Sequence, residues 1–209
     1  MDFNWLIPVI IALMVYACVY YYLKSRKVLP HVIDFMGPCI MIKTERVGFF
    51  DTLARPKKLL YAYATAGVLI TLLCAVVVTV MFLVSGILSL TVQTDPIPPQ
   101  DLLLIPGLNS YVPSTFALWF ALFFAMIIHE AGHGIISRVE KMRVKSTGLL
   151  TLIIPIGAFV ESYGEDVEKA TLGSKLRMFA AGITNNMVVG TICLVLLAAL
   201  LGMAVPGDH

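Results

Sequence analysis

Long apolar stretches separated by short charged ones dominate the chain. A helix needs roughly twenty apolar residues to cross about 30 Å of hydrocarbon. Stretches that meet this length begin near the N-terminus, after the basic residues at 55–58, after Pro113 and at about Leu176. We therefore predict about four transmembrane helices, over residues 3–23, 59–92, 114–138 and 176–204.

Two shorter apolar stretches cannot span a bilayer as helices. Residues 37–44 (GPCIMIKT) lie between a Gly-Pro pair and a charge, a pattern typical of a short strand. Residues 148–161 (GLLTLIIPIGAFVE) contain Pro155 and Gly157, which break a helix. We expect this second stretch to form a re-entrant loop or a strand at the membrane edge. The predicted class is thus an all-α multi-pass membrane protein with short strands or a re-entrant loop on its cytoplasmic side.

Composition supports this class and excludes others. The 209 residues are 59% hydrophobic and 13% charged, whereas soluble domains are about half apolar and about a quarter charged. The formal net charge of +2 gives no reason to expect nucleic acid as a partner. The four cysteines show no C-x-x-C spacing, so they indicate neither a disulfide framework nor a thiolate metal site. The lipid bilayer is the expected surrounding.

The basic residues predict the orientation of the helices. All fifteen Lys and Arg residues fall within the windows 24–58, 138–145 and 169–177. Short loops that carry Lys and Arg are retained on the cytoplasmic side. We therefore expect a protein of the cell membrane with both termini and residues 93–113 on the extracytoplasmic side.

These segments divide the chain into three sections. Residues 1–58 hold the first transmembrane helix and a cytoplasmic basic loop, and residues 59–113 hold the second helix and an external loop rich in proline. Residues 114–209 hold the third helix, the stretch 148–161 and the fourth helix. This last section contains the candidate chemistry.

The third predicted helix carries the motif H-E-x-x-H. His129 and His133 are four residues apart, so they lie on one face of a helix and can bind one cation. In this motif the two histidines bind zinc and the glutamate, here Glu130, is a general base. Random placement of the histidines and glutamates of the chain would give roughly 0.002 such motifs.

A metal or proton transporter is an alternative, because His and Glu in a membrane helix can also line an ion path. His129 is predicted to lie roughly 13 Å inside the cytoplasmic end of its helix, at 1.5 Å per residue. A buried Glu130 between two histidines is costly there unless a cation compensates its charge. A bound divalent ion is therefore the favoured interpretation, with the active site near the cytoplasmic side.

Three segments together resemble the site-2 protease family of intramembrane zinc metalloproteases. They are residues 129–134 (HEAGHG), 148–161 and 178–186 (MFAAGITNN), in the family's order and spacing. The stretch 37–44 also resembles a segment found upstream of the catalytic core in some members. The resemblance implies a zinc endopeptidase that cleaves transmembrane substrates in regulated intramembrane proteolysis. It also implies His129 and His133 as Zn²⁺ ligands and Glu130 as the base.

The chain departs from this family in one respect. Members take a third zinc ligand from an Asp in an L-D-G motif, and this sequence has no such motif. Catalytic zinc requires three protein ligands and a water, so we expect this chain alone to be inactive and partly or wholly metal-free. It would be an incomplete chain or half of a split enzyme, with a C-terminal half or PDZ region supplying the third ligand. A non-catalytic scaffold is the other alternative.

Residues outside the motif give weaker predictions. Glu161 is the one carboxylate considered as a substitute third ligand, although an interfacial position is favoured. Ile153 and Ile154 are predicted to bind substrate, because an extended peptide could pair with an apolar strand edge near the active site. Asn186 matches the Asn that closes the family's A-G-x-x-x-N block. It is expected either to hold the substrate backbone or the oxyanion, or to tie its helix to the third helix with Asn185.

Overall fold

A computed structural model describes residues 6–91, 98–102, 105–152 and 155–204. The protein is mostly helical, with one small antiparallel sheet. Its elements are, in chain order, α1 (Leu6–Arg26), β1 (Ile33–Met36), β2 (Cys39–Thr44), α2 (Phe49–Leu53), α3 (Lys57–Thr91), η2 (Pro99–Leu102), α4 (Phe116–Val139), β3 (Val144–Thr151), β4 (Pro155–Ser162), α5 (Gly164–Lys169) and α6 (Leu172–Ala204).

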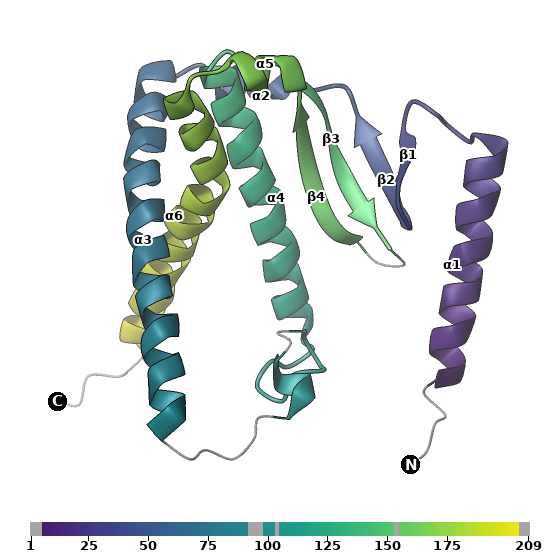
Figure 1. The fold of residues 1–209 in the computed structure, drawn as a ribbon, viewed down its shortest axis with the longest axis horizontal. Helices are drawn as coiled ribbons and strands as arrows, with labels where there is room; N and C mark the ends of the chain where they lie inside the picture. The colour runs from purple at the N-terminus through teal and green to yellow at the C-terminus, as the bar shows by residue number, and fades with distance from the viewer. Residues whose placement is uncertain (1–5, 92–97, 103–104, 153–154, 205–209) are drawn as a thin grey trace.

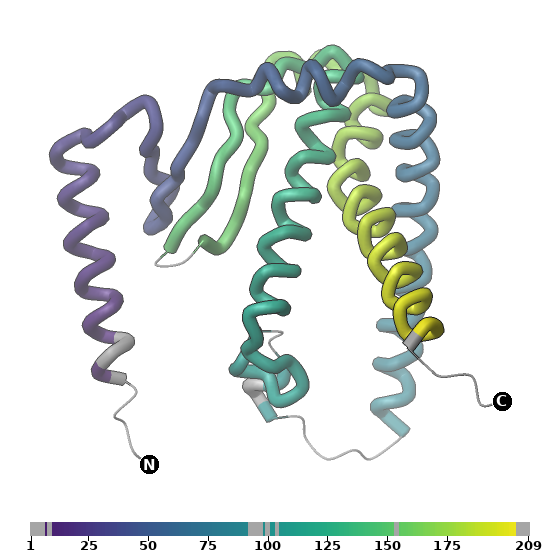
Figure 2. The backbone as a smooth tube through the Cα atoms, turned by 180° about the vertical axis from the view of Figure 1, so that it is seen from behind, coloured from purple at the N-terminus to yellow at the C-terminus, as the bar shows by residue number. Residues whose placement is uncertain are grey.

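The long helices stand side by side, with the sheet next to them. In Figure 1, α3 and α6 lie on one side of α4, the sheet lies on the other side, and α1 stands beyond the sheet. Figure 2 shows the same order from behind. The short helices α2 and α5 lie at the end of the bundle where α4 ends and α3 and α6 begin. This end also holds the sheet.

Three of the described helices are long and apolar enough to cross a membrane. They are α3, α4 and residues Leu172–Met203 of α6, and they confirm long apolar helices within three of the predicted segments, 59–92, 114–138 and 176–204. The first predicted span, residues 3–23, overlaps α1, which is helical as expected. Its first residues lie outside the described part of the chain, so the crossing by α1 stays a prediction.

The sheet is larger than the sequence analysis predicts. Its strand order is β1-β2-β3-β4, and each neighbouring pair is antiparallel. The stretch 148–161 falls within β3 and β4, two strands of a hairpin, so the strand alternative holds over the described residues. A Cβ atom at Gly148 would overlap the backbone carbonyl of Ile42, so glycine lets β2 and β3 approach each other there.

Small residues bring α4 and α6 together. A Cβ atom at Gly132 would lie 2.7 Å from the carbonyl oxygen of Ala181, and Ala181 is fully buried. The contact belongs to a core between α3, α4 and α6 that also contains Ala64, Ile136 and Met178. Close approach through small side chains is how membrane helices associate, because lipid gives no hydrophobic driving force between them.

A nearly buried ion pair joins the same three helices at their sheet-side end. The Arg177 guanidinium on α6 donates to both carboxylate oxygens of Glu140, which follows α4. The guanidinium also lies over the ring of Tyr61 on α3, 4.2 Å from its centre. Burial by itself would raise the pKa of Glu140, but the hydrogen bonds from Arg177 hold it below its ordinary value. This pair fixes the helix ends next to the histidine motif.

Candidate metal centre

The residues of the H-E-x-x-H motif meet on α4. The helix begins where Thr115 accepts a hydrogen bond from the backbone N–H of Leu118 and therefore caps it. One ligand atom each from His129, Glu130 and His133 lies within 4.8 Å of the others. The two imidazole rings are 4.9 Å apart between centres and nearly perpendicular, at 78°. The i, i+4 spacing thus produces the predicted cluster.

His133 has a defined tautomer because of a contact with α6. Its Nδ1 atom lies 2.7 Å from the backbone carbonyl oxygen of Met178. A carbonyl oxygen can only accept a hydrogen bond, so Nδ1 carries the proton. Nε2 of the neutral ring then has a free lone pair. Histidines that bind metals usually show this arrangement, with the second nitrogen donating to a carbonyl or carboxylate.

His129 packs directly against α6. A Cβ atom at Gly182 would lie 2.5 Å from Nε2 of His129 and close to two of its ring carbons. The other ring nitrogen, Nδ1, lies 3.3 Å from Nδ2 of Asn186, one turn further along α6. The helix α6 therefore shapes the space around both histidines.

Glu130 faces the opposite neighbour, the sheet. Its Oε2 atom accepts a hydrogen bond of 3.0 Å from the backbone N–H of Val160 on β4. Beside this contact lies a cavity of about 310 Å³ between α4, α2 and the sheet. Its lining is largely apolar: Phe49, Phe50, Phe123, Ile127, Leu149, Ala158 and Val160 accompany Glu130. Sequence patterns do not predict the Val160 contact, because it joins residues thirty positions apart.

The donor set fits a zinc ion. Zinc accepts imidazole nitrogen and carboxylate oxygen, and it requires neutral imidazoles. His133 is already held in the form that binds through Nε2. The Glu130 carboxylate adds a negative charge within the same group of atoms. Two histidines and a carboxylate in this arrangement are able to hold a divalent cation and to accept a proton beside it.

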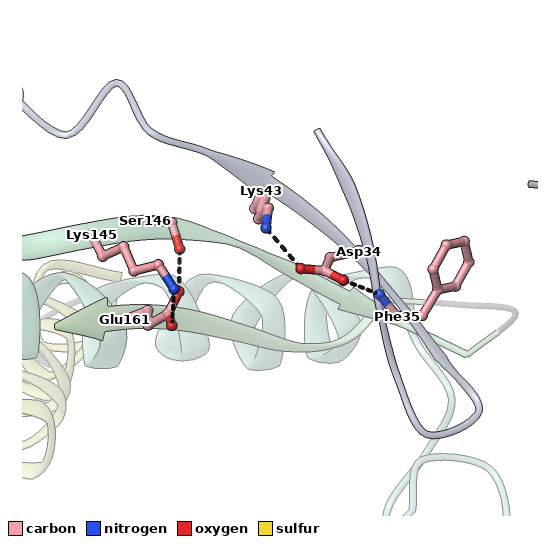
Figure 3. A network of polar contacts seen from close by, with 6 residues as sticks. All are labelled: Asp34, Phe35, Lys43, Lys145, Ser146 and Glu161. Atoms are coloured by element: carbon pink, nitrogen blue, oxygen red, sulfur yellow. Dashed lines mark hydrogen bonds and ion pairs between the residues drawn. The ribbon is translucent and has the colours of Figure 1, made fainter. Parts of the chain in front are cut away.

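Glu161 is engaged elsewhere. Figure 3 shows its carboxylate accepting hydrogen bonds from Lys145, at 2.9 Å, and from Ser146, at 2.8 Å. A second ion pair on the same sheet joins Lys43 to Asp34. Lys145 holds the pKa of Glu161 below its ordinary value. Within the described residues, the atoms grouped around the two histidines do not include Glu161, in keeping with the favoured interfacial interpretation.

The remaining predicted residues separate into two groups. Asn185 accepts a hydrogen bond from the Tyr63 hydroxyl, at 2.7 Å, and donates to the backbone carbonyl of Ile128, at 3.2 Å. It therefore ties α6 to α3 and α4, whereas Asn186 contacts His129. Ile153 and Ile154 lie outside the described residues.

An apolar helix long enough to span a bilayer, α4, carries the H-E-x-x-H cluster. A family model for Peptidase family M50 matches residues 117–207, which run from α4 through the hairpin to α6. The match covers somewhat less than half of the chain. For this segment, the match confirms the resemblance to the site-2 protease family. Members of that family use zinc.

The similarity to an individual protein covers a shorter segment. An uncharacterized protein of Methanocaldococcus jannaschii is 36% identical over 70 residues, which make up 33% of this chain. These residues make up 19% of the relative, so the match spans about a fifth of that protein's length. No solved structure matches the chain.

Proposed function

We propose that this chain carries the zinc-binding and proton-transferring residues of a site-2-type endopeptidase that hydrolyses peptide bonds of transmembrane proteins. The observation that carries the proposal is the cluster of His129, Glu130 and His133 on a helix of membrane-spanning length. The family match over residues 117–207 supports it, because that segment contains the whole cluster.

His129 and His133 would hold the zinc ion, each through one ring nitrogen. A third protein ligand would come from a C-terminal half or from a region bearing a PDZ domain, because a catalytic zinc site needs three ligands and an open position. When bound, zinc lowers the pKa of water toward about 7 and polarises a carbonyl group.

Glu130 would act as the general base. Its carboxylate accepts a proton from the attacking water and passes it to the leaving amine. The hydrogen bond from Val160 occupies Oε2 and limits the rotation of the carboxylate. The same contact places the base at the edge of the sheet, next to the apolar cavity.

We place the substrate along the free edge of β4. This strand is the last in the sheet order, and Val160 directs its N–H away from β3 toward α4. A peptide bond within a helix has its carbonyl already hydrogen-bonded, so the substrate must unwind locally before attack. Pairing with an unpaired strand edge would restore its backbone hydrogen bonds. Ile153 and Ile154 remain predicted contributors to this surface.

The sheet end of the bundle would face the cytoplasm. The described Lys and Arg residues of all three basic windows belong to this end, and positively charged loops are retained on that side. Both termini would then be extracytoplasmic. The metal centre would lie in the cytoplasmic half of the membrane.

The test of the proposed activity is Glu130→Gln in the complete protein, reconstituted in liposomes with a transmembrane reporter. We expect cleavage that depends on added Zn²⁺ and is removed by a chelator. Because the amide cannot accept the proton, the variant should lose about 10²- to 10⁴-fold in rate. Glu168→Gln is the matched control, since Glu168 is an exposed glutamate away from the cluster. Equal cleavage by Glu130→Gln and the wild type would refute proteolysis and favour transport or a scaffold role.

A further inference from the structure

Asn186 contacts His129 through its carboxamide, and this contact leaves one of its polar atoms without a partner. Nδ2 lies 3.3 Å from Nδ1 of His129. The Oδ1 atom is buried and has no hydrogen-bond partner among the described residues. Burying a carbonyl oxygen without a donor costs free energy, so this side chain needs an explanation.

The orientation of the carboxamide decides the tautomer of His129. With the NH₂ group toward the ring, Nδ1 must accept a hydrogen bond, so the proton of the neutral ring lies on Nε2. Rotation of the carboxamide by 180° exchanges two groups of the same shape, and it costs little sterically. Oδ1 then accepts a hydrogen bond from Nδ1–H of His129. This arrangement gives the oxygen a donor and leaves Nε2 with a free lone pair.

His133 already shows the second arrangement. Its Nδ1–H donates to the carbonyl oxygen of Met178, which also belongs to α6. The two residues of α6 are eight positions apart, and each faces one of two histidines that are four positions apart on α4. A backbone oxygen and a side-chain oxygen would therefore prepare the two rings in the same way.

We infer that Asn186 is a positioning residue, whose carboxamide oxygen accepts the Nδ1 proton of His129 and so directs Nε2 of that ring to the metal. The inference rests on the proposed function, because it concerns the same zinc site. It differs from a substrate-binding role for Asn186, in which the side chain would contact the scissile peptide. Removing the hydrogen-bond partner of a metal-binding histidine typically weakens metal affinity by about 10- to 100-fold.

The first experiment measures the Zn²⁺ dissociation constant of the complete protein purified in detergent, by competition with a chromogenic chelator. Asn186→Leu keeps the size of the side chain and removes the acceptor, so we expect the dissociation constant to rise about 10- to 100-fold. Asn186→Asp keeps an acceptor oxygen and should bind zinc at least as tightly as the wild type. Tyr63→Phe is the control, because it removes the neighbouring hydrogen bond to Asn185 without touching either histidine. Equal zinc affinity of Asn186→Leu and the wild type would overturn the inference.

The second experiment reads the tautomer without zinc. Nitrogen-15 NMR of histidine-labelled, metal-free protein distinguishes a protonated Nδ1 from a protonated Nε2, and the variants His129→Gln and His133→Gln assign the signals. We expect Nδ1–H for His129 in the wild type and a shift toward Nε2–H in Asn186→Leu, while His133 keeps Nδ1–H in both. A wild-type His129 protonated on Nε2 would contradict the inference. If the complete protein, with its third ligand, binds no zinc, the proposed function fails, and this measurement decides the role of Asn186 by itself.

Discussion

Gly182 determines how closely the ring of His129 can approach α6. Any Cβ atom at this position would lie 2.5 Å from Nε2 and 2.6 Å from Cδ2, well inside van der Waals contact. Gly190, two turns further along the same helix, has no atom within 4 Å of the corresponding position. The effect of an added methyl group can therefore be compared at a tightly packed glycine and at an open one within the same helix.

We expect Gly182→Ala to displace His129 and to weaken zinc binding. Overpacking of this kind typically costs about 1–3 kcal/mol of unfolding free energy, and it should lower the thermal unfolding midpoint in detergent. Gly190→Ala should leave the zinc dissociation constant unchanged and should stabilise slightly, because alanine favours a helix by up to about 1 kcal/mol over glycine. If both variants retained the zinc affinity of the wild type, the packing of His129 on Gly182 would have no role in metal binding.

The residues of the cluster were predictable because their relation is local. A helix places positions i and i+4 on one face whatever surrounds it. The proximity of His129 and His133 could therefore be predicted without knowledge of the fold. The contacts of His129 with Gly182, of His133 with Met178 and of Glu130 with Val160 join separate elements. No periodicity in the sequence encodes those pairings.

Among the elements, β4 is the last strand of the described sheet, and it contacts the H-E-x-x-H motif. Val160 directs its N–H to Glu130. Strand residues two positions apart face the same side, so Ala158 presents its N–H to the same edge. A substrate that adds to this edge would use that donor.

Ala158→Pro removes this N–H and should therefore reduce cleavage of a transmembrane reporter by the complete enzyme. We expect a loss of about tenfold in rate, which corresponds to one lost hydrogen bond of about 1.4 kcal/mol. Proline is tolerated on edge strands, so circular dichroism and the unfolding midpoint should change little. Ala158→Ser keeps the N–H and is the control. Undiminished turnover of the proline variant would exclude substrate pairing at this position.

Helices were easier to predict than strands. The spans α3, α4 and α6 follow from apolar length alone, which depends on the thickness of the bilayer. Strand β1 went unpredicted, because Ile33–Met36 is four residues long and includes Asp34. Strand β3 begins at Val144, before the apolar stretch, where buried and exposed residues alternate. The polar residues of β3 belong to the strand because they pair with β4, for example Ser146 with Glu161.

On the scale of the whole molecule, the orientation that we propose in the membrane rests on the uneven distribution of charge. Ser110 lies in the segment between α3 and α4, and Glu168 lies in α5 at the opposite end of the bundle. Both residues are exposed. The proposed orientation places them on opposite sides of the bilayer.

Labelling with a membrane-impermeant maleimide tests this orientation in a variant without the native cysteines. Ser110→Cys should react in intact cells, and Glu168→Cys should react only after permeabilisation. The reverse pattern would invert the proposed topology, and it would place the metal centre near the extracytoplasmic surface.

The helix that carries the motif is the least hydrophobic of the three candidate spans and the most enclosed by its neighbours. Of the most apolar 18 residues of each helix, 22% are buried in α4, 6% in α3 and none in α6. A glutamate within a span opposes insertion from the translocon into lipid. The hydrogen bond that Glu130 accepts comes from Val160 on β4, and Gly182, which packs against His129, belongs to α6, so both partners are synthesised after α4. A nascent chain therefore gains the contacts that orient both histidines only after α6 is synthesised, and a ribosome that stalls before α6 leaves the histidines of α4 without those partners.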